Sequence, residues 1–381
     1  MQKPHIIYLQ QNLALGACEE YFYLLMEGVD QDRFNAAFVC PGNPVFDSLV
    51  IKVEALGIKA YRYQPGSSNY QLIIQLQSFF RKLKPDIVHF NDPCLLGIIA
   101  ARLAGVPVLL MTHHTPELNR KYNLKARLLE RIAFKYCGVY AIFTSEYDRD
   151  TGIKKDKIPA QRSFVIYYGL PPERFSHKYD KKEIYAEFSL DDQCHIVGNV
   201  ARLSSQKGQR YLIEAAPLII KEIKAVKFFF VGEGELESEL KAQVQQNGLQ
   251  DYFIFTGHRA DIPRLLSAFE ILVMPSLFEG LCFAVIEASA MGVPVIATAV
   301  GGLRRSVIDG KTGLLIPGGD SRALAKAILW MLARPKEAQE MGLAGRKYFE
   351  ELFTQERMVK KTAELYKILL DKTGRIFNSH A

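Results

Sequence analysis

The sequence predicts an α/β protein made of two doubly wound domains. Its 381 residues are long for one hydrophobic core and enough for two domains of roughly 150 to 200 residues each. Short runs of β-branched and aromatic residues alternate with helical patterns in both halves of the chain. Most of these runs are apolar throughout, which is typical of parallel strands that helices cover on both faces. We therefore expect one parallel sheet in each half.

The expected strands fall into two groups. In the first half they lie near residues 6–9, 36–39, 87–90, 108–111, 140–144 and 164–168. In the second half they lie near 195–200, 228–231, 253–256, 271–274, 295–298 and 313–316. The polar stretch 170–183 is the best candidate for a linker, and only helical patterns follow Ser321. These limits predict an N-terminal domain over 1–175 and a C-terminal domain over 190–350.

Composition restricts the partners and the compartment. A net charge of +7 favours anions such as nucleotides, phosphorylated lipids or anionic bilayers, among which charge alone does not choose. No apolar run reaches about 18 residues, and the run at 6–9 is too short for a signal peptide. The six cysteines include no C-x-x-C pair, which favours free thiols over a disulfide frame or a zinc site. We expect a cytoplasmic protein.

Glu279 and Glu287 lie in the most informative segment. A loop with Pro, Ser and Gly precedes an apolar stretch that stops at Gly292, which predicts a buried helix with a glycine stop. Glu279 then lies in the loop and Glu287 inside the helix, where a carboxylate needs a partner. A solvated acid and a structural salt bridge would explain each alone. Together, with helix amides between them, they suit a ligand anionic in its middle and hydroxylated at both ends, such as a sugar nucleotide.

Positive charges follow another strand of the second half. Arg202 and Lys207 come after the strand at 195–200, and Gly208 then lets the backbone approach a ligand closely. Ligands of doubly wound sheets bind beyond the carboxyl ends of the strands. Two cations placed there suit an anionic ligand. The alternative is a pair of solvated surface cations.

The first half offers two weaker candidates. The segment 10–20 follows the first strand and opens a helix, so amides near Gly16 are placed to cap a diphosphate. Thr112-His113-His114-Thr115-Pro116 follows the strand at 108–111, which puts a histidine pair at the carboxyl end of that strand. We expect His113 to be the histidine that faces the ligand, with His114 as the second candidate.

These segments together resemble family 4 of the retaining glycosyltransferases, which have the GT-B fold. Glu279 and Glu287 resemble the family's E-x7-E element, Arg202 to Gly208 its basic R-L…K-G loop, and the segment 229–234 its V-G-x-G strand end. Further matching segments occur at 255–258 and 301–313, with looser ones at 84–89, 143–146 and 169–175. The similarity covers nearly the whole chain and is strongest from about Val197 to Gly319.

The resemblance implies a division of labour. Two Rossmann-like domains would face each other across a cleft, with the acceptor on the first and the nucleotide sugar on the second. The last helix would cross back onto the first domain. The resemblance also implies that Arg202 and Lys207 bind the diphosphate and that Glu287 binds the ribose. Glu279 and a histidine would contact the transferred sugar. Further implied donor contacts are Gly16, Gly257, His258 and the amides of Leu281, Cys282 and Phe283.

The same resemblance implies transfer with retention, no metal and no other cofactor. Two D-x-D segments, Asp30 to Asp32 and Asp148 to Asp150, spell a metal-binding element of another glycosyltransferase fold, but chance and surface exposure explain both. Cys282 stands where the family often has glycine, which leaves the sugar open. Rival functions are a sugar-nucleotide epimerase or hydrolase on the same fold and a catalytically silent binding protein.

A basic segment follows the histidine pair. Between residues 119 and 135, six cations accompany one acid, Glu130, and Leu124, Leu128 and Ile132 recur at helical spacing. We expect a lipid-linked or other glycan acceptor, reached at an anionic membrane surface, and no nucleic acid. The alternative buries the apolar stripe in the core. Expected acceptor or membrane contacts are Arg120, Lys121, Lys125 and Arg127.

Overall fold

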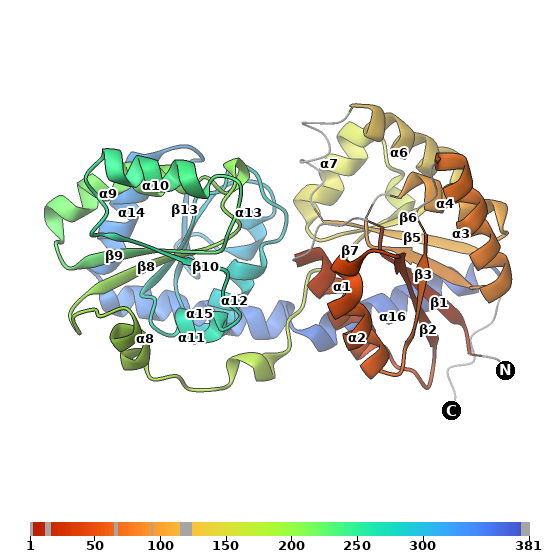
Figure 1. Ribbon diagram of the computed structural model, residues 1–381, viewed down its shortest axis with the longest axis horizontal. Helices are drawn as coiled ribbons and strands as arrows, with labels where there is room; N and C mark the ends of the chain where they lie inside the picture. Colours follow the sequence, from red (N-terminus) through yellow and green to blue (C-terminus); the bar gives the residue numbers. More distant parts are fainter. Residues whose placement is uncertain (1–2, 12–16, 65–67, 93, 115–123, 375–381) are drawn as a thin grey trace. The chain divides into compact units, whose positions relative to one another are not determined.

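The computed structural model describes residues 3–11, 17–64, 68–92, 94–114 and 124–374. The chain divides into two compact units, one comprising Met1–Gly169 with Gln355–Ala381 and the other Leu170–Thr354. Each unit contains one parallel sheet with helices on both faces (Figure 1). The prediction of two doubly wound, Rossmann-like domains is therefore confirmed.

The sheet of the first unit has seven strands in the order β3-β2-β1-β4-β5-β6-β7. The strands are β1 His5–Leu9, β2 Asn35–Pro41, β3 Lys59–Tyr63, β4 Ile87–Phe90, β5 Val108–His113, β6 Tyr140–Phe143 and β7 Ser163–Val165. Its helices are α1 Ala17–Gly28, α2 Asp47–Ala55, α3 Asn69–Leu83, α4 Leu95–Leu103, α6 Leu124–Cys137, α7 Glu146–Asp156 and α16 Gln355–Asp371.

Two details of this sheet differ from the prediction. The edge strand β3 was not expected, and β7 stops at Val165 rather than reaching Tyr168. The β3 sequence, Lys-Ala-Tyr-Arg-Tyr, contains no unbroken apolar run, because this edge strand is little covered and only its last residue, Tyr63, is buried. Beyond β7 the chain leaves the sheet and buries the Tyr168 ring.

The sheet of the second unit has six strands in the order β10-β9-β8-β11-β12-β13. The strands are β8 His195–Val200, β9 Val226–Val231, β10 Phe253–Gly257, β11 Ile271–Met274, β12 Val295–Thr298 and β13 Gly313–Ile316. The helices are α8 Lys181–Glu187, α9 Gln209–Glu222, α10 Glu237–Gln246, α11 Ile262–Leu266, α12 Phe283–Met291, α13 Leu303–Ser306, α14 Ser321–Leu332 and α15 Pro335–Leu352.

Each sheet separates two hydrophobic cores. In β9, Phe228 and Phe230 pack in the core with α9, α10 and α14, whereas Phe229 and Val231 pack in the core with α8, α11 and α12 (Figure 1). Successive side chains of a strand point to opposite faces, so a strand covered on both sides must be apolar throughout. This requirement explains why these strands were recognisable in the sequence.

The end of the chain completes the first unit. Helix α16 packs on α1, and its Tyr366 side chain is buried, with the hydroxyl 2.7 Å from Nδ1 of His89. The segment after Gly169 belongs to the second unit. There the Leu170 amide donates to the Phe353 carbonyl at 2.8 Å. None of the described helices is long and apolar enough to cross a membrane.

Candidate active site

The second sheet changes direction between β8 and β11. Strands β9 and β10 extend from β8 on one side, and β12 and β13 extend from β11 on the other. The loops that leave the carboxyl ends of β8 and β11 therefore diverge and leave a crevice between them, the usual place for a ligand in such a sheet. These two loops carry Arg202 and Lys207, and Glu279, respectively.

Glycines let the loops at this edge pack backbone against backbone. Gly208 has a φ of +66°, and a Cβ atom there would lie 2.2 Å from the Pro275 carbonyl oxygen. Gly301 has a φ of +47°, and its Cβ atom would lie 1.9 Å from the Glu279 carbonyl oxygen. Any side chain at either position would force the loops apart. The glycines thus fix the backbone on which the charged side chains stand.

Lys207 and Glu279 form an ion pair that joins the two loops. Only 17% of the Lys207 side chain and 7% of the Glu279 side chain are exposed. Burial opposes the charge of Lys207, but the attraction of Glu279 and the hydrogen bond between them outweigh it, so the pKa of Lys207 is raised. Lys207 is therefore charged at neutral pH. Gln206 supports this geometry by donating to the Phe278 carbonyl at 3.2 Å.

Arg202 differs from Lys207 in exposure. Its side chain is 71% exposed and contacts Glu235, with Nη2 3.3 Å from Oε2. Such an exposed pair contributes little to stability. The Arg202 guanidinium is thus an exposed cation on the same loop as the buried Lys207 ammonium.

Helix α12 begins at the same edge. Its N-cap is Cys282, whose side chain makes no capping hydrogen bond. Leu281 and Cys282 are buried and Phe283 is half-buried. Burial raises the pKa of the Cys282 thiol to about 11, with the charge of Lys207 opposing the shift, so the thiol is neutral. A neutral N-cap at a helix N-terminus is compatible with an anionic ligand.

Glu287 lies one turn inside α12 and is buried. Its Oε1 atom is 3.7 Å from Nη2 of Arg174, which belongs to the short 3-10 helix Pro172–Phe175. The sequence analysis took this region as a linker and missed Arg174. Its segment resembled a family motif, but only the tertiary contact shows what the arginine touches.

Gly257 and His258 lie at the end of β10, the edge strand. The Gly232 amide donates to the Gly257 carbonyl at 2.9 Å, and the His258 amide lies 3.2 Å from Oε1 of Glu233. The His258 side chain is exposed. These contacts tie the end of β10 to the loop after β9, but the measured geometry does not join His258 to Lys207 or Glu279.

In the first unit the side chains of His113 and His114 have different surroundings. His113 ends β5, and its ring stacks on Phe143 with 4.9 Å between the ring centres. His114 is also buried, but Nδ1 lies 2.6 Å from the Tyr168 hydroxyl and Nε2 lies 2.9 Å from Oδ1 of Asn91. Because Oδ1 only accepts, Nε2 donates and Nδ1 accepts from the tyrosine. Burial lowers the pKa of His114 to about 4, so the ring is neutral at pH 7.

The switch point of the first sheet lies between β1 and β4, and Gln10 and Asn91, which follow them, are hydrogen-bonded to each other. Asn91 links this switch point to His114. The candidates Gly16, Arg120 and Lys121 lie outside the described residues, as do the side chains of Lys125 and Arg127 on α6.

Carboxylates of the first unit were also candidates for metal binding. The Ser145 hydroxyl donates a hydrogen bond to Oδ2 of Asp148 at 2.6 Å. Asp30 forms an ion pair with Arg33. Ligand atoms of Cys18, Asp92 and His114 lie within 4.8 Å of one another. Both nitrogens of His114 already make hydrogen bonds, so this group would have to break one of them to bind a metal.

Two Rossmann-like units, with a buried ion pair and a second cation at the switch point of the second, define a glycosyltransferase of the GT-B class. Family models agree: residues 18–174 match the model for Glycosyltransferase Family 4, and residues 194–334 match the model for Glycosyl transferases group 1. The chain belongs to this glycosyltransferase family.

Relatives with known names cover most of the chain. The UDP-Gal:alpha-D-GlcNAc-diphosphoundecaprenol alpha-1,3-galactosyltransferase of Escherichia coli is 30% identical over 86% of this chain and 87% of that protein. The capsular polysaccharide biosynthesis glycosyltransferase CapM of Staphylococcus aureus is 26% identical over 80% of this chain and 83% of that protein. Among solved structures, Anabaena Alr3699/HepE in complex with UDP-glucose is 23% identical, with a TM-score of 0.83 over 95% of this chain and 98% of that one.

Proposed function

We propose that the protein transfers a sugar from a nucleotide diphosphate sugar to an acceptor hydroxyl, with retention and without a metal. The observation that carries this proposal is the buried Lys207–Glu279 pair at the switch point of the second unit, beside Arg202. A buried ammonium and an exposed guanidinium at one sheet edge provide the positive charge that a diphosphate leaving group needs. The donor then binds the second unit and the acceptor the first.

Each candidate residue has a proposed task. Lys207 and Arg202 stabilise the negative charge that develops on the diphosphate. Glu279 contacts hydroxyls of the transferred sugar and, through its ion pair, holds Lys207 in position. Glu287 accepts hydrogen bonds from the ribose hydroxyls, and Arg174 pairs with its carboxylate inside a mostly apolar helix. The amides at the start of α12 face the distal phosphate.

The contacts of His113 and His114 support a proposal for which of the two is nearer the transferred sugar. His113 is stacked on Phe143 and Phe134, whereas His114 already makes polar contacts at the carboxyl edge of its sheet. We therefore propose His114, rather than His113, as the candidate for the sugar. Both of its nitrogens already make hydrogen bonds, so a contact with a hydroxyl would replace the bond to Tyr168 or to Asn91.

For the chemical step we propose departure and attack on the same face of the sugar. The bond from the anomeric carbon to the diphosphate breaks, the bond to the acceptor oxygen forms, and the acceptor proton passes to the departing phosphate. This route needs no carboxylate nucleophile. It also requires that Lys207 and Arg202 act on the transition state more than on the bound substrate.

The relatives support a UDP-sugar donor and an acceptor in polysaccharide or glycolipid synthesis. Anabaena HepE was solved with UDP-glucose, and the Escherichia coli relative acts on a diphosphoundecaprenol-linked sugar. We propose a lipid-linked acceptor of this class, reached by a peripheral protein at the inner face of the cell membrane.

A panel of nucleotide sugars tests the donor first. A ligand at 100 times its Kd should add about 2.7 kcal/mol of stability, which a thermal shift detects. The donor that stabilises the protein is then incubated with lipid-linked sugar acceptors, and the anomeric configuration of the product is read by NMR. Inversion would contradict the proposed mechanism. Donor hydrolysis at full rate without an acceptor would support the hydrolase instead.

A further inference from the structure

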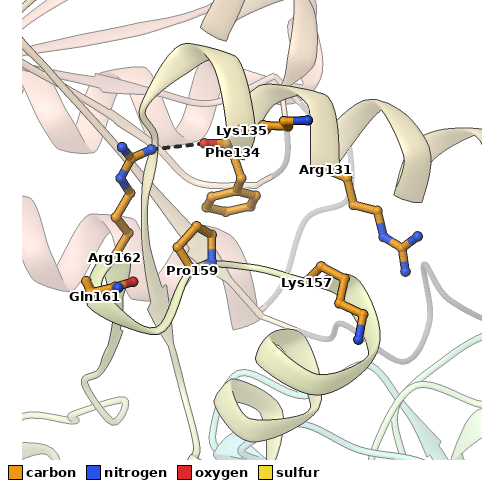
Figure 2. A pocket seen from close by; sticks show the side chains of 7 residues that line it. All are labelled: Arg131, Phe134, Lys135, Lys157, Pro159, Gln161 and Arg162. Carbon is orange, nitrogen blue, oxygen red and sulfur yellow. Dashed lines mark hydrogen bonds between the residues drawn. The ribbon is translucent and has the colours of Figure 1, made fainter.

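A basic pocket lies in the first unit, and none of the residues that line it is among those proposed above to contact the donor. It has a volume of about 610 Å³ and lies between α6 and the chain that follows α7. In Figure 2 the Phe134 and Pro159 rings face each other, and the charged side chains of Arg131 and Lys157 extend past them. The full lining consists of Arg131, Phe134, Lys135, Lys157, Pro159, Gln161 and Arg162.

The lining is positive and is not neutralised. Among its seven described residues four are cations and none is a carboxylate. Arg131 donates from Nε to the Asp156 carbonyl at 3.1 Å, and Arg162 donates from Nη1 to the Phe134 carbonyl at 2.9 Å (Figure 2). Because these partners are neutral carbonyls, the guanidinium groups are fixed in place while their charge remains available to an anion.

The two lysines are held differently. Lys135 and Lys157 are exposed, and within the described part of the chain neither forms an ion pair with a carboxylate. Lys135 lies 5.1 Å from the centre of the Tyr136 ring, the next residue of α6. The pocket therefore combines two fixed cations with two that can adjust to a ligand.

Apolar side chains project into solvent from the same helix. Leu128 is 58% exposed, Ile132 is 42% exposed and Tyr136 is 70% exposed. Residues four apart share one face of a helix, so these three form a stripe. For this part of α6 the interpretation that the stripe is buried in the core is wrong. Arg131 and Lys135 each lie three residues beyond Leu128 and Ile132, so stripe and pocket adjoin.

We propose that this pocket binds the phosphate headgroup of an anionic phospholipid, with Leu128, Ile132 and Tyr136 entering the bilayer interface beside it. A phosphate matches the four cations. The exposed aliphatic stripe selects a lipid over a free phosphate or a nucleic acid, since only the lipid offers apolar surface beside its charge. The inference deepens the proposed membrane association and in that respect rests on the proposed function, although the residues that line the pocket are not those proposed for the donor.

The test is sedimentation of the full chain with vesicles. Vesicles of phosphatidylcholine with phosphatidylglycerol are compared with vesicles of phosphatidylcholine alone, at several salt concentrations. The variant Lys135→Gln/Lys157→Gln leaves the two arginines, and hence their backbone contacts, in place. Its matched control is Arg81→Gln/Lys82→Gln, which removes two exposed cations from α3 of the same unit.

Wild type and control should bind the anionic vesicles, more weakly as salt rises, and the pocket variant should bind about 25-fold more weakly, at about fivefold for each cation near an anionic surface. A second pair tests the stripe. Leu128→Gln/Ile132→Gln should weaken binding, whereas Ile51→Gln/Ile74→Gln, which also changes exposed isoleucines, should not.

Several outcomes would overturn the inference. Wild-type affinity in the pocket variant, or equal losses in pocket and control variants, would remove any role for the pocket. Stabilisation of the wild type by inorganic phosphate that the pocket variant loses, without vesicle binding, would indicate a site for free anions, and retention of a DNA fragment alone would indicate a nucleic-acid surface. Donor-induced thermal stabilisation is measured in every variant. It should stay at the wild-type value, so failure of the lipid site and failure of the proposed function give different results.

Discussion

Lys207 and Glu279 are paired across the switch point of the second sheet, each from a different loop. Removing one partner of a buried ion pair leaves the other charge unpaired, which typically costs about 3 to 5 kcal/mol. The pair therefore stabilises the two loops in addition to any catalytic role. Comparing variants of Lys207 and Arg202 distinguishes the structural role from the catalytic one.

Lys207→Ala and Arg202→Ala should each lower turnover by on the order of 10²-fold, because each removes one donor to the developing diphosphate charge. Their stabilities should differ. Lys207→Ala should lower the midpoint of thermal denaturation, since Glu279 is buried, whereas the 71% exposed Arg202 should be replaceable without loss. Steady-state kinetics and thermal denaturation of both variants measure the contrast. Equal stabilities would show that the buried pair does not hold the loops together.

Glu279→Gln and Glu287→Gln should fail in different ways. If Glu287 holds the ribose equally in the ground and transition states, its replacement mainly raises KM for the donor. Glu279 contacts the transferred sugar in our proposal, so its replacement should mainly lower kcat. Glu270→Gln, a change of a more exposed carboxylate in the same unit, is the control. Wild-type kcat and KM in both variants would remove the two glutamates from the site.

Gly301→Ala should be far more damaging than Gly248→Ala, although both glycines have a positive φ. A left-handed backbone costs a non-glycine residue about 1 kcal/mol or more at either site. At Gly248 no atom lies within 4 Å of the new Cβ atom, whereas at Gly301 the Glu279 carbonyl oxygen lies 1.9 Å away. We expect Gly301→Ala to reduce the free energy of unfolding by about 3 kcal/mol or more. Similar losses in both variants would mean that the loops are not closely packed.

Acid should destabilise the first unit through His114. Its pKa is about 4 in the folded protein and near 6.5 when unfolded, so its contribution is complete above pH 6.5 and is lost as the pH falls toward 4. Between pH 7 and 5 the free energy of unfolding of His114→Gln should fall by about 2 kcal/mol less than that of the wild type. His195 gives the opposite control, since a hydrogen bond to Glu270 raises its pKa and its contribution is present at low pH. A wild-type slope in His114→Gln would contradict the assignment.

A chelator should leave turnover unchanged. Our proposal gives the diphosphate two cationic side chains, and Asp148 of one D-x-D segment is occupied with Ser145 at the start of α7. Activity measured with EDTA, and again after adding manganese, checks this. Loss with EDTA and recovery with manganese would overturn the metal-free mechanism.

The strands could be predicted from the sequence because burial on both faces requires unbroken apolar runs. The same reasoning could not find β3, where Lys59 and Arg62 face solvent at the sheet edge. Nor could it predict the different surroundings of His113 and His114. Successive residues point in opposite directions, and His113 stacks on Phe143, which comes from another strand.

The site could be predicted as far as its loops. The spacing of charged residues and glycines placed Arg202, Lys207 and Glu279 beyond strand ends, where the structure has them. Which carboxylate meets which cation depends on tertiary contacts. The Arg174–Glu287 contact was therefore missed, and so was the adjacency of α6 and the chain after α7 that forms the basic pocket.

The origin of α16 has a consequence for synthesis. The strands of the first unit are synthesised before the second unit. Tyr366, which forms a hydrogen bond with His89 of the first unit, is synthesised after the whole second unit. The second unit is continuous in the sequence, so all of its helices and strands have been synthesised once Thr354 has been added. The first unit must wait with the face under α16 uncovered, so the half of the chain that is made first is the half that is finished last.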